Sequence, residues 1–128
     1  MDFPEELKYS KEHLWVRVEG NQAVIGISDY AQDYLGDVKA VELPSVDDEL
    51  EQDDSFGSLE GRKTIVELYA PVSGTVVEVN DELEGTPELI NDDPYDSGWI
   101  LVVQLADEEE LKMLMSADDY SEHVTHVE

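Results

Sequence analysis

The sequence predicts one domain of mainly β structure, with short helices beside it. Apolar and polar residues alternate with a period of two in many short runs, as in half-buried strands. Glycine, proline and asparagine interrupt these runs at short intervals, which is typical of strands joined by turns. The 128 residues suit a single hydrophobic core, so we expect one domain over 1–128.

The alternating runs predict strands over 14–19, 23–27, 37–43, 55–60, 65–69, 75–79 and 99–105. Gly20-Asn21 joins the first two as a hairpin, and Pro44 ends the third. Only Gly61-Arg62-Lys63-Thr64 separates the fourth from the fifth. This is hairpin spacing, and we expect Gly61 to supply the conformational freedom of the turn.

Capping residues predict where the helices lie. Ser28 suits the N-cap of a helix over 29–35, and Gly36 follows where helices commonly end on glycine. Asp107, with an acid three residues later, predicts a helix over about 107–115, and a second helical turn is expected over 117–124. The acid-rich stretch within 42–60 is expected to form two loops around a short apolar step at Leu50, and 80–98 is expected to be loop-like.

The composition excludes several classes of function. The chain has 33 acidic and 7 basic residues, a net charge of −26, which repels nucleic acids and anionic membranes. No apolar run approaches the roughly 18 residues that span a bilayer, and the N-terminus lacks the features of a signal or transit peptide. We therefore expect a cytoplasmic protein. It has no cysteine, so any thiol chemistry would come from an attached group.

Lys63 is the first candidate for chemistry, because it lies at the predicted tip of a tight hairpin. Such a lysine often only keeps a turn soluble. The alternative is a modification site, since a hairpin tip presents its amine to a modifying enzyme while the strands stay rigid.

The residues around Lys63, and many others in the same order, resemble the H-protein of the glycine cleavage system. The matching blocks span roughly 7–120 and leave a C-terminal tail at about 121–128. They include Tyr9, His13 with Trp15-Val16, Gly26 to Gln32, Leu35 to Val38, Val41 to Pro44, Phe56 to Thr64, Tyr69 to Asn80, Leu89 to Asn91, Pro94-Tyr95 and Gly98-Trp99. The resemblance implies a barrel-sandwich hybrid fold, as in lipoyl and biotinyl carrier domains.

The resemblance also implies roles for individual residues. Lys63 falls where the family bears lipoic acid in amide linkage. Glu60, Glu67 and Gly74 fall where it presents features recognised by the lipoylating enzyme. The first block implies a cleft for the arm, which we expect Glu12, His13 and Glu67 to line.

Two positions depart from the family pattern. Leu14 occupies a place where the family usually has an acid that helps line the cleft, so the polar contact of that acid is in doubt. Glu12 is near enough in sequence to substitute for it. Asp47 occupies a usual glycine position in a turn, which affects local turn chemistry and one recognition feature rather than the fold.

A carrier rather than an enzyme is implied by the resemblance. Glycine decarboxylase, a pyridoxal-phosphate enzyme, would load an aminomethyl group onto the lipoyl arm. The tetrahydrofolate-dependent aminomethyltransferase would take the one-carbon unit, and dihydrolipoamide dehydrogenase would reoxidise the dithiol. A lipoate ligase or lipoyl transfer enzyme would attach the arm. We expect a monomer.

The sequence is also compatible with other functions. A lipoyl relay or storage carrier outside glycine cleavage has the same sequence features, and an unmodified acidic interaction module is the plainest alternative. A biotin carrier is disfavoured, because Arg62 and Thr64 flank Lys63 where biotinyl sites have methionines. His123 and His126 are three residues apart in a segment expected to fray, which makes a metal site there unfavourable, and we expect none.

The acidity also suggests adaptation to high salt, because screening relieves the repulsion among like charges. The melting temperature should then rise clearly between low and high sodium chloride, as measured by circular dichroism. A flat response would contradict this hypothesis.

Overall fold

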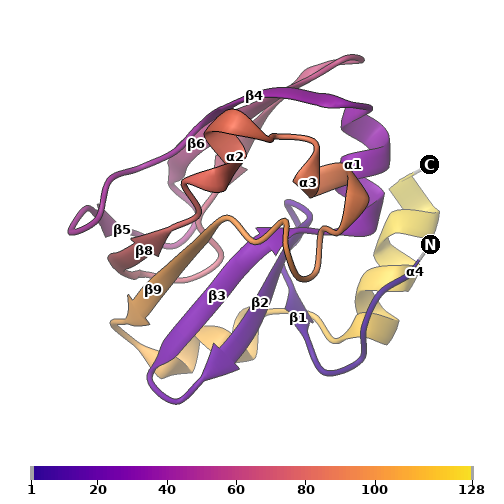
Figure 1. The fold of residues 1–128 in the computed structure, drawn as a ribbon. Coiled ribbons are helices and arrows are strands. Elements are labelled where there is room, and N and C mark those ends of the chain that lie inside the picture. Colours follow the sequence, from indigo (N-terminus) through magenta and orange to yellow (C-terminus); the bar gives the residue numbers. More distant parts are fainter. Residues whose placement is uncertain (1, 128) are drawn as a thin grey trace.

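The computed structural model describes residues 2–127, and side chains as far as Thr125. Figure 1 shows two sheets with short helices around them. The strands are β1 (Lys8–Tyr9), β2 (Leu14–Glu19), β3 (Gln22–Ile27), β4 (Val38–Glu42), β5 (Glu49–Leu50), β6 (Ser55–Gly61), β7 (Ile65–Tyr69), β8 (Gly74–Val79) and β9 (Leu101–Leu105). The helices are α1 (Asp29–Leu35), α2 (Glu82–Gly85), α3 (Leu89–Asp92), the 3-10 helix η1 (Glu108–Met113) and α4 (Ala117–Val127).

Antiparallel pairing organises the strands. One sheet has the order β1-β2-β3-β9-β8-β5, and the other has the order β4-β6-β7. The pairing of β3 with β9 brings the first hairpin against a strand that is far along the chain. The mainly β prediction is therefore confirmed, and each strand predicted from alternation is present to within about two residues.

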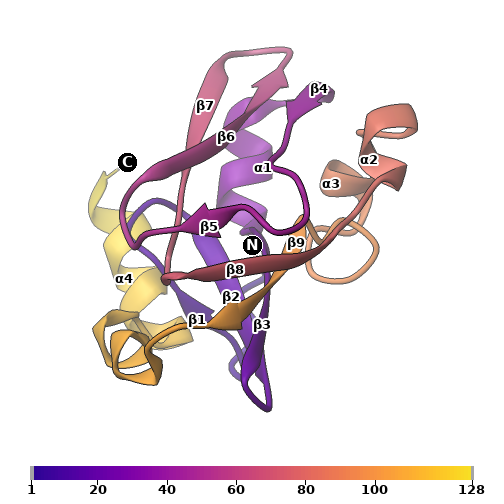
Figure 2. The same ribbon diagram turned by 90° about the vertical axis from the view of Figure 1, so that its left-hand side faces the viewer.

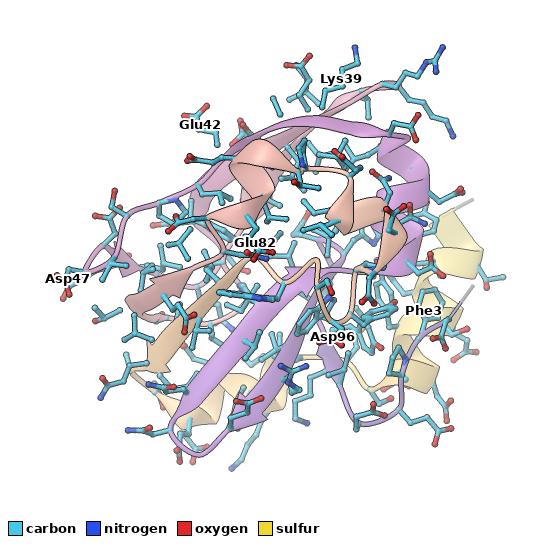
Figure 3. All side chains as sticks on the ribbon, viewed as in Figure 1. Phe3, Lys39, Glu42, Asp47, Glu82 and Asp96 are labelled. Atoms are coloured by element: carbon cyan, nitrogen blue, oxygen red, sulfur yellow. The ribbon has the colours of Figure 1, made fainter. Side chains whose placement is uncertain are left out.

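Apolar side chains between the sheets form one core. The strands β2 and β3 are buried on both faces, since their alternate residues enter a second cluster. Leu14, Ile25, Leu59, Leu68 and Val103 are among the residues with at most 1% of their surface exposed. A second cluster packs α4 against β1, where the rings of Tyr9 and Tyr120 stack at 4.7 Å. Phe3 contacts the edges of both rings, and Figure 3 shows it beside α4.

The helix α1 forms as its capping residues predict. The hydroxyl of Ser28 accepts a hydrogen bond from the N–H of Ala31, and Gly36 ends the helix with a φ of 72°. Left-handed backbone of this kind is least strained in glycine. Because α1 joins β3 to β4, its C-terminal end lies where the chain passes from one sheet to the other.

Several segments differ from the sequence-based expectation. The predicted loop over 80–98 contains the single-turn helices α2 and α3, which are too short to show a periodic pattern. The helix predicted near 107–115 is the 3-10 helix η1. Asp107 caps it by accepting from the N–H of Glu109, and Glu110 accepts hydrogen bonds from Ser73. The short strands β1 and β5 had no alternating signal. The expected turn over 117–124 and much of the expected tail form one helix, α4.

The hairpin of β6 and β7 rests on the end of α1 rather than projecting freely. A Cβ atom on Gly61 would lie 2.3 Å from the carbonyl oxygen of Leu35, closer than any side chain allows. The φ of Gly61 is not positive. The expectation that Gly61 supplies turn freedom is therefore wrong, and glycine is needed here for the close approach of two backbones.

Gly61→Ala should lower the free energy of unfolding by roughly 1–3 kcal/mol, the usual cost of overpacking. Gly85→Ala is the matched control, because nothing lies within 4 Å of its new methyl group. Urea unfolding should show a loss for the first variant and no loss for the second. Equal stabilities of Gly61→Ala and the wild type would contradict the close-approach explanation.

Candidate functional site

Lys63 lies in the turn between β6 and β7, with its side chain exposed. Its backbone N–H donates to the carbonyl of Leu35 at 2.9 Å, and the N–H of Arg62 donates to the carbonyl of Asp37 at 2.9 Å. The amine Nζ donates to the carbonyl of Asp33 at 3.1 Å. Figure 2 shows this end of the hairpin above α1 and beside β4. The turn is thus held in one place while the amine stays accessible.

The two acids predicted to be recognition features lie on the same hairpin as Lys63. Ser58 faces Glu67 and Glu60 faces Ile65 in the β6–β7 register, so both carboxylates lie on the same exposed face of the sheet. Glu67 also accepts a short hydrogen bond from the hydroxyl of Ser55.

Gly74 does not join this group. It begins β8 and pairs with Leu105 and Leu50, at the far end of β7 from the turn. A Cβ atom there would lie 2.3 Å from the carbonyl oxygen of Gln104. Its position therefore has a packing reason, whatever enzyme recognises the surface.

One face of α1 lines a pocket of about 480 Å³. Glu12, His13 and Glu67, the expected cleft residues, all line it. The other lining residues are Lys11, Leu14, Ile27, Tyr30, Ala31, Tyr34, Leu35, Leu59, Val66, Leu68, Tyr69 and His123. Most of these are apolar or aromatic, which is typical of small-molecule sites with few polar groups.

The other face of α1 lines a smaller groove of about 300 Å³, and Lys63 lies in this groove. Gln32, Asp33 and Gly36 contribute from the helix and its end, and Asn91 contributes from α3. The last turn of α1 therefore stands between the lysine and the pocket.

His13 is the central polar group of the pocket. Its Nδ1 and the hydroxyl of Tyr120 are hydrogen-bonded at 2.8 Å, and that hydroxyl is also bonded to the hydroxyl of Ser28 at 2.7 Å. Burial, together with the nearby His123, lowers the pKa of His13 to about 4. Burial likewise raises the pKa of Tyr120. Both groups are neutral at pH 7, so the network ties α4 to the cap of α1 without a charge.

Leu14 is buried in β2, opposite Ile27, and presents an apolar surface to the pocket. Glu12 lines the same pocket and is exposed. A carboxylate is therefore available at the pocket beside the apolar side chain of Leu14.

The described residues contain no group of three or more ligating side chains that could hold a metal. His123 faces His13, with ring centroids 6.0 Å apart, and the side chain of His126 lies outside the described part. None of the described helices is long and apolar enough to cross a membrane.

Sequence reasoning missed several residues of the site. Tyr34 and His123 line the pocket, and Asn91 lines the groove, yet none was singled out for these positions. Tyr34 lies one helical turn after Tyr30, a spacing that places both on one face of α1 and could have predicted this wall. His123 had no such signal, because its place depends on the packing of α4.

The lowered pKa of His13 predicts a pH-dependent stability. Below about pH 6.5 the unfolded chain gains a proton that the folded chain gains only near pH 4, so folding becomes less favourable as the pH falls through this window. His13→Asn removes the titration, and asparagine tolerates the φ of 73° at this position.

Urea unfolding between pH 7 and pH 4 should show the wild type losing stability relative to His13→Asn. Because both proteins carry the same carboxylates, their difference isolates the histidine. A difference in unfolding free energy between the two proteins that stays constant from pH 7 to pH 4 would contradict the lowered pKa of His13.

Comparison with known proteins agrees with the geometry. The family described as Glycine cleavage H-protein matches residues 7–127. The glycine cleavage system H proteins of Staphylococcus saprophyticus subsp. saprophyticus and Staphylococcus haemolyticus are each 58% identical to this chain over 124 residues, 97% of this chain and 98% of the relative.

A solved structure supports the same relationship. The crystal structure of a glycine cleavage system H protein from Mycobacterium marinum matches with a TM-score of 0.87 and 32% identity, over 96% of this chain and 99% of that one. The match confirms the expected mainly β barrel-sandwich hybrid with short helices. The chain belongs to the glycine cleavage H-protein family.

Proposed function

We propose that this chain is a lipoyl carrier of the glycine cleavage system, with lipoic acid in amide linkage to Nζ of Lys63. The observation that carries the proposal is an exposed lysine at the tip of a fixed hairpin, in a chain of this family. The chain acts as a carrier and not as an enzyme, and its work is to present the arm to each partner.

The surroundings of Lys63 fit the attachment of a carboxylic acid. Its amine is exposed and, among the described residues, hydrogen-bonds to one backbone carbonyl, so an enzyme can draw it away at little cost. Glu60 and Glu67 give a modifying enzyme two carboxylates on the same hairpin. Gly74 is remote from them, so we propose that it contributes to recognition only through the shape of the fold.

Once attached, the lipoyl group would supply a disulfide that is reduced when the aminomethyl group is loaded at glycine decarboxylase, with loss of carbon dioxide. The aminomethyltransferase would take the one-carbon unit and release ammonia, and dihydrolipoamide dehydrogenase would reoxidise the remaining dithiol. The chain has no cysteine that could exchange with this disulfide. The fixed turn raises the effective concentration of the arm at each docked active site.

We propose that the apolar pocket beside α1 shelters the loaded arm from water. Glu12 and Glu67 would offer carboxylates to a cationic amine, and neutral His13 would offer a ring nitrogen without adding positive charge. The apolar surface of Leu14 keeps water out at the position where the family usually has an acid.

The negative charge of the surface would favour association with the partner enzymes. Figure 3 labels Glu42, Asp47, Glu82 and Asp96, which come from β4, the loop after it, α2 and the loop after α3. A field of one sign over so much of the surface would steer encounters with less acidic enzymes, and salt would weaken it.

A lipoyl relay outside glycine cleavage would use the same lysine. Exchange of bicarbonate into the carboxyl group of glycine, measured with glycine decarboxylase and the lipoylated protein, separates the two. Exchange supports glycine cleavage, and its absence with fully lipoylated protein would favour the relay.

Expression with a lipoate ligase and lipoate should give one lipoyl-sized mass increment in intact mass spectrometry. Lys63→Ala should lose this increment completely, since no other amine occupies the recognised turn. Lys39→Ala is the matched control, because Lys39 is an exposed lysine on the neighbouring strand β4, and it should keep the increment. An unmodified wild-type chain, or a modified Lys63→Ala, would refute the proposed attachment site.

A further inference from the structure

Asn91 makes contacts that the proposed carrier role leaves unexplained. It lies on α3, whose buried Ile90 anchors that helix in the core. Its side-chain oxygen accepts from the N–H of Val38 at 2.8 Å, and its side-chain nitrogen donates to the carbonyl of Gly36 at 2.9 Å. The same nitrogen donates to the side-chain oxygen of Gln32 at 3.1 Å.

These bonds fix the segment 35–38 from one side. The carboxamide acts like a peptide group, since it satisfies an acceptor at Gly36 and a donor at Val38 together. Asparagine is suited to this place, because aspartate lacks the donor and an apolar side chain lacks both groups. Without these bonds the carbonyl of Gly36 and the N–H of Val38 would lose their partners in a partly buried place.

The attachment turn fixes the same segment from the other side. The carbonyls of Leu35 and Asp37 accept from the N–H groups of Lys63 and Arg62, both at 2.9 Å. Residues 35 and 37 therefore face the turn, whereas the carbonyl of Gly36 and the N–H of Val38 face Asn91.

The side chain of Lys63 also depends on this segment. A Cβ atom on Gly36 would lie 3.1 Å from Cγ of Lys63 and 3.4 Å from its Cδ. The methylenes of the lysine thus lie over the bare backbone of Gly36, and its amine reaches the carbonyl of Asp33. A shift of Gly36 would move both supports of Lys63.

We propose that Asn91 is a positioning residue for the modification of Lys63. It holds residues 36–38 in the shape on which the turn and the lysine side chain rest, and so it presents the amine to the modifying enzyme. This inference rests on the proposed lipoyl attachment at Lys63, and it assigns a task to a residue of the Leu89-Ile90-Asn91 block.

Asn91→Asp tests the proposal, because it keeps the oxygen that accepts from Val38 and removes the donor to Gly36. Asn80→Asp is the matched control: Asn80 is buried, and its nitrogen donates to the carbonyls of Ser97 and Trp99, away from Lys63. Both variants lose a side-chain donor to backbone carbonyls, so both report the general cost of that loss.

Two measurements are made on each folded protein. The first is the kcat/KM of a lipoate ligase, with ATP and lipoate present and the carrier protein as the varied substrate. It should fall about tenfold for Asn91→Asp and by less than about twofold for Asn80→Asp. Hydrogen exchange followed by NMR should show the amides of Arg62 and Lys63 exchanging about tenfold faster in Asn91→Asp and unchanged in Asn80→Asp.

Equal losses of lipoylation kcat/KM in the two variants would overturn the proposal. An unchanged exchange rate of the Arg62 and Lys63 amides in Asn91→Asp would also overturn it. So would faster exchange at the turn with normal lipoylation. A wild-type chain that takes no lipoate at Lys63 would refute the carrier function itself, and the exchange data would still decide whether Asn91 holds the turn.

If Asn91→Asp fails to fold, Gln32→Ala provides the second variant. It removes one acceptor of the Asn91 amide from the surface of α1 and should raise exchange at Arg62 and Lys63 by about twofold. Unchanged exchange in this variant would count against the proposal.

Discussion

The position of Lys63 depends on one constraint, the contact between the backbone of the turn over residues 62–64 and the C-terminal end of α1. The last carbonyls of a helix have no partner within it, and here the turn supplies a donor to Leu35. The contact lies where the chain passes from one sheet to the other, so it joins the turn that bears Lys63 to the core. The close approach of the backbones at Gly61 and Leu35 explains why residue 61 has no room for a side chain.

The sequence predicted the elements whose signals are local. Alternation placed the strands, and Ser28 and Gly36 bounded α1, because side chains next to the helix ends determine capping. Lys63, Glu60 and Glu67 could be grouped on one hairpin from spacing and resemblance alone. The role of Gly61 was predicted wrongly, since a turn glycine and a close-approach glycine look the same in sequence.

Contacts between segments that are far apart in the chain could not be predicted from the sequence. Val38 meets Asn91 across 53 residues, and His13 meets Tyr120 across 107. Such pairs have no periodic pattern, and they follow from the register of the sheets and the packing of α4. The same holds for Glu110, which bonds to Ser73 across 37 residues although Asp107 caps η1 as predicted. The polar residues of the site are therefore harder to predict than its strands.

The surface of the molecule is densely charged, whereas the hydrogen-bond network at the pocket is uncharged. Only Arg17 with Glu19 and Lys112 with Glu109 form ion pairs among the described side chains, and both pairs are exposed, so they add little to stability. Neutral groups join α4 to α1 at the pocket. Screening by salt therefore acts on the surface and leaves this internal network unchanged.

The dependence of the Lys63 turn on α1 means that the proposed modification site is not a portable sequence tag. A peptide covering 55–69 carries the lysine and both hairpin acids, but it lacks the carbonyls of Asp33, Leu35 and Asp37 that the turn uses as acceptors. Two short strands alone are also marginally stable in water. Transfer of this site to another protein would therefore require the end of α1 and, if Asn91 acts as proposed, the helix α3 that bears it, both of which the surrounding fold holds in place.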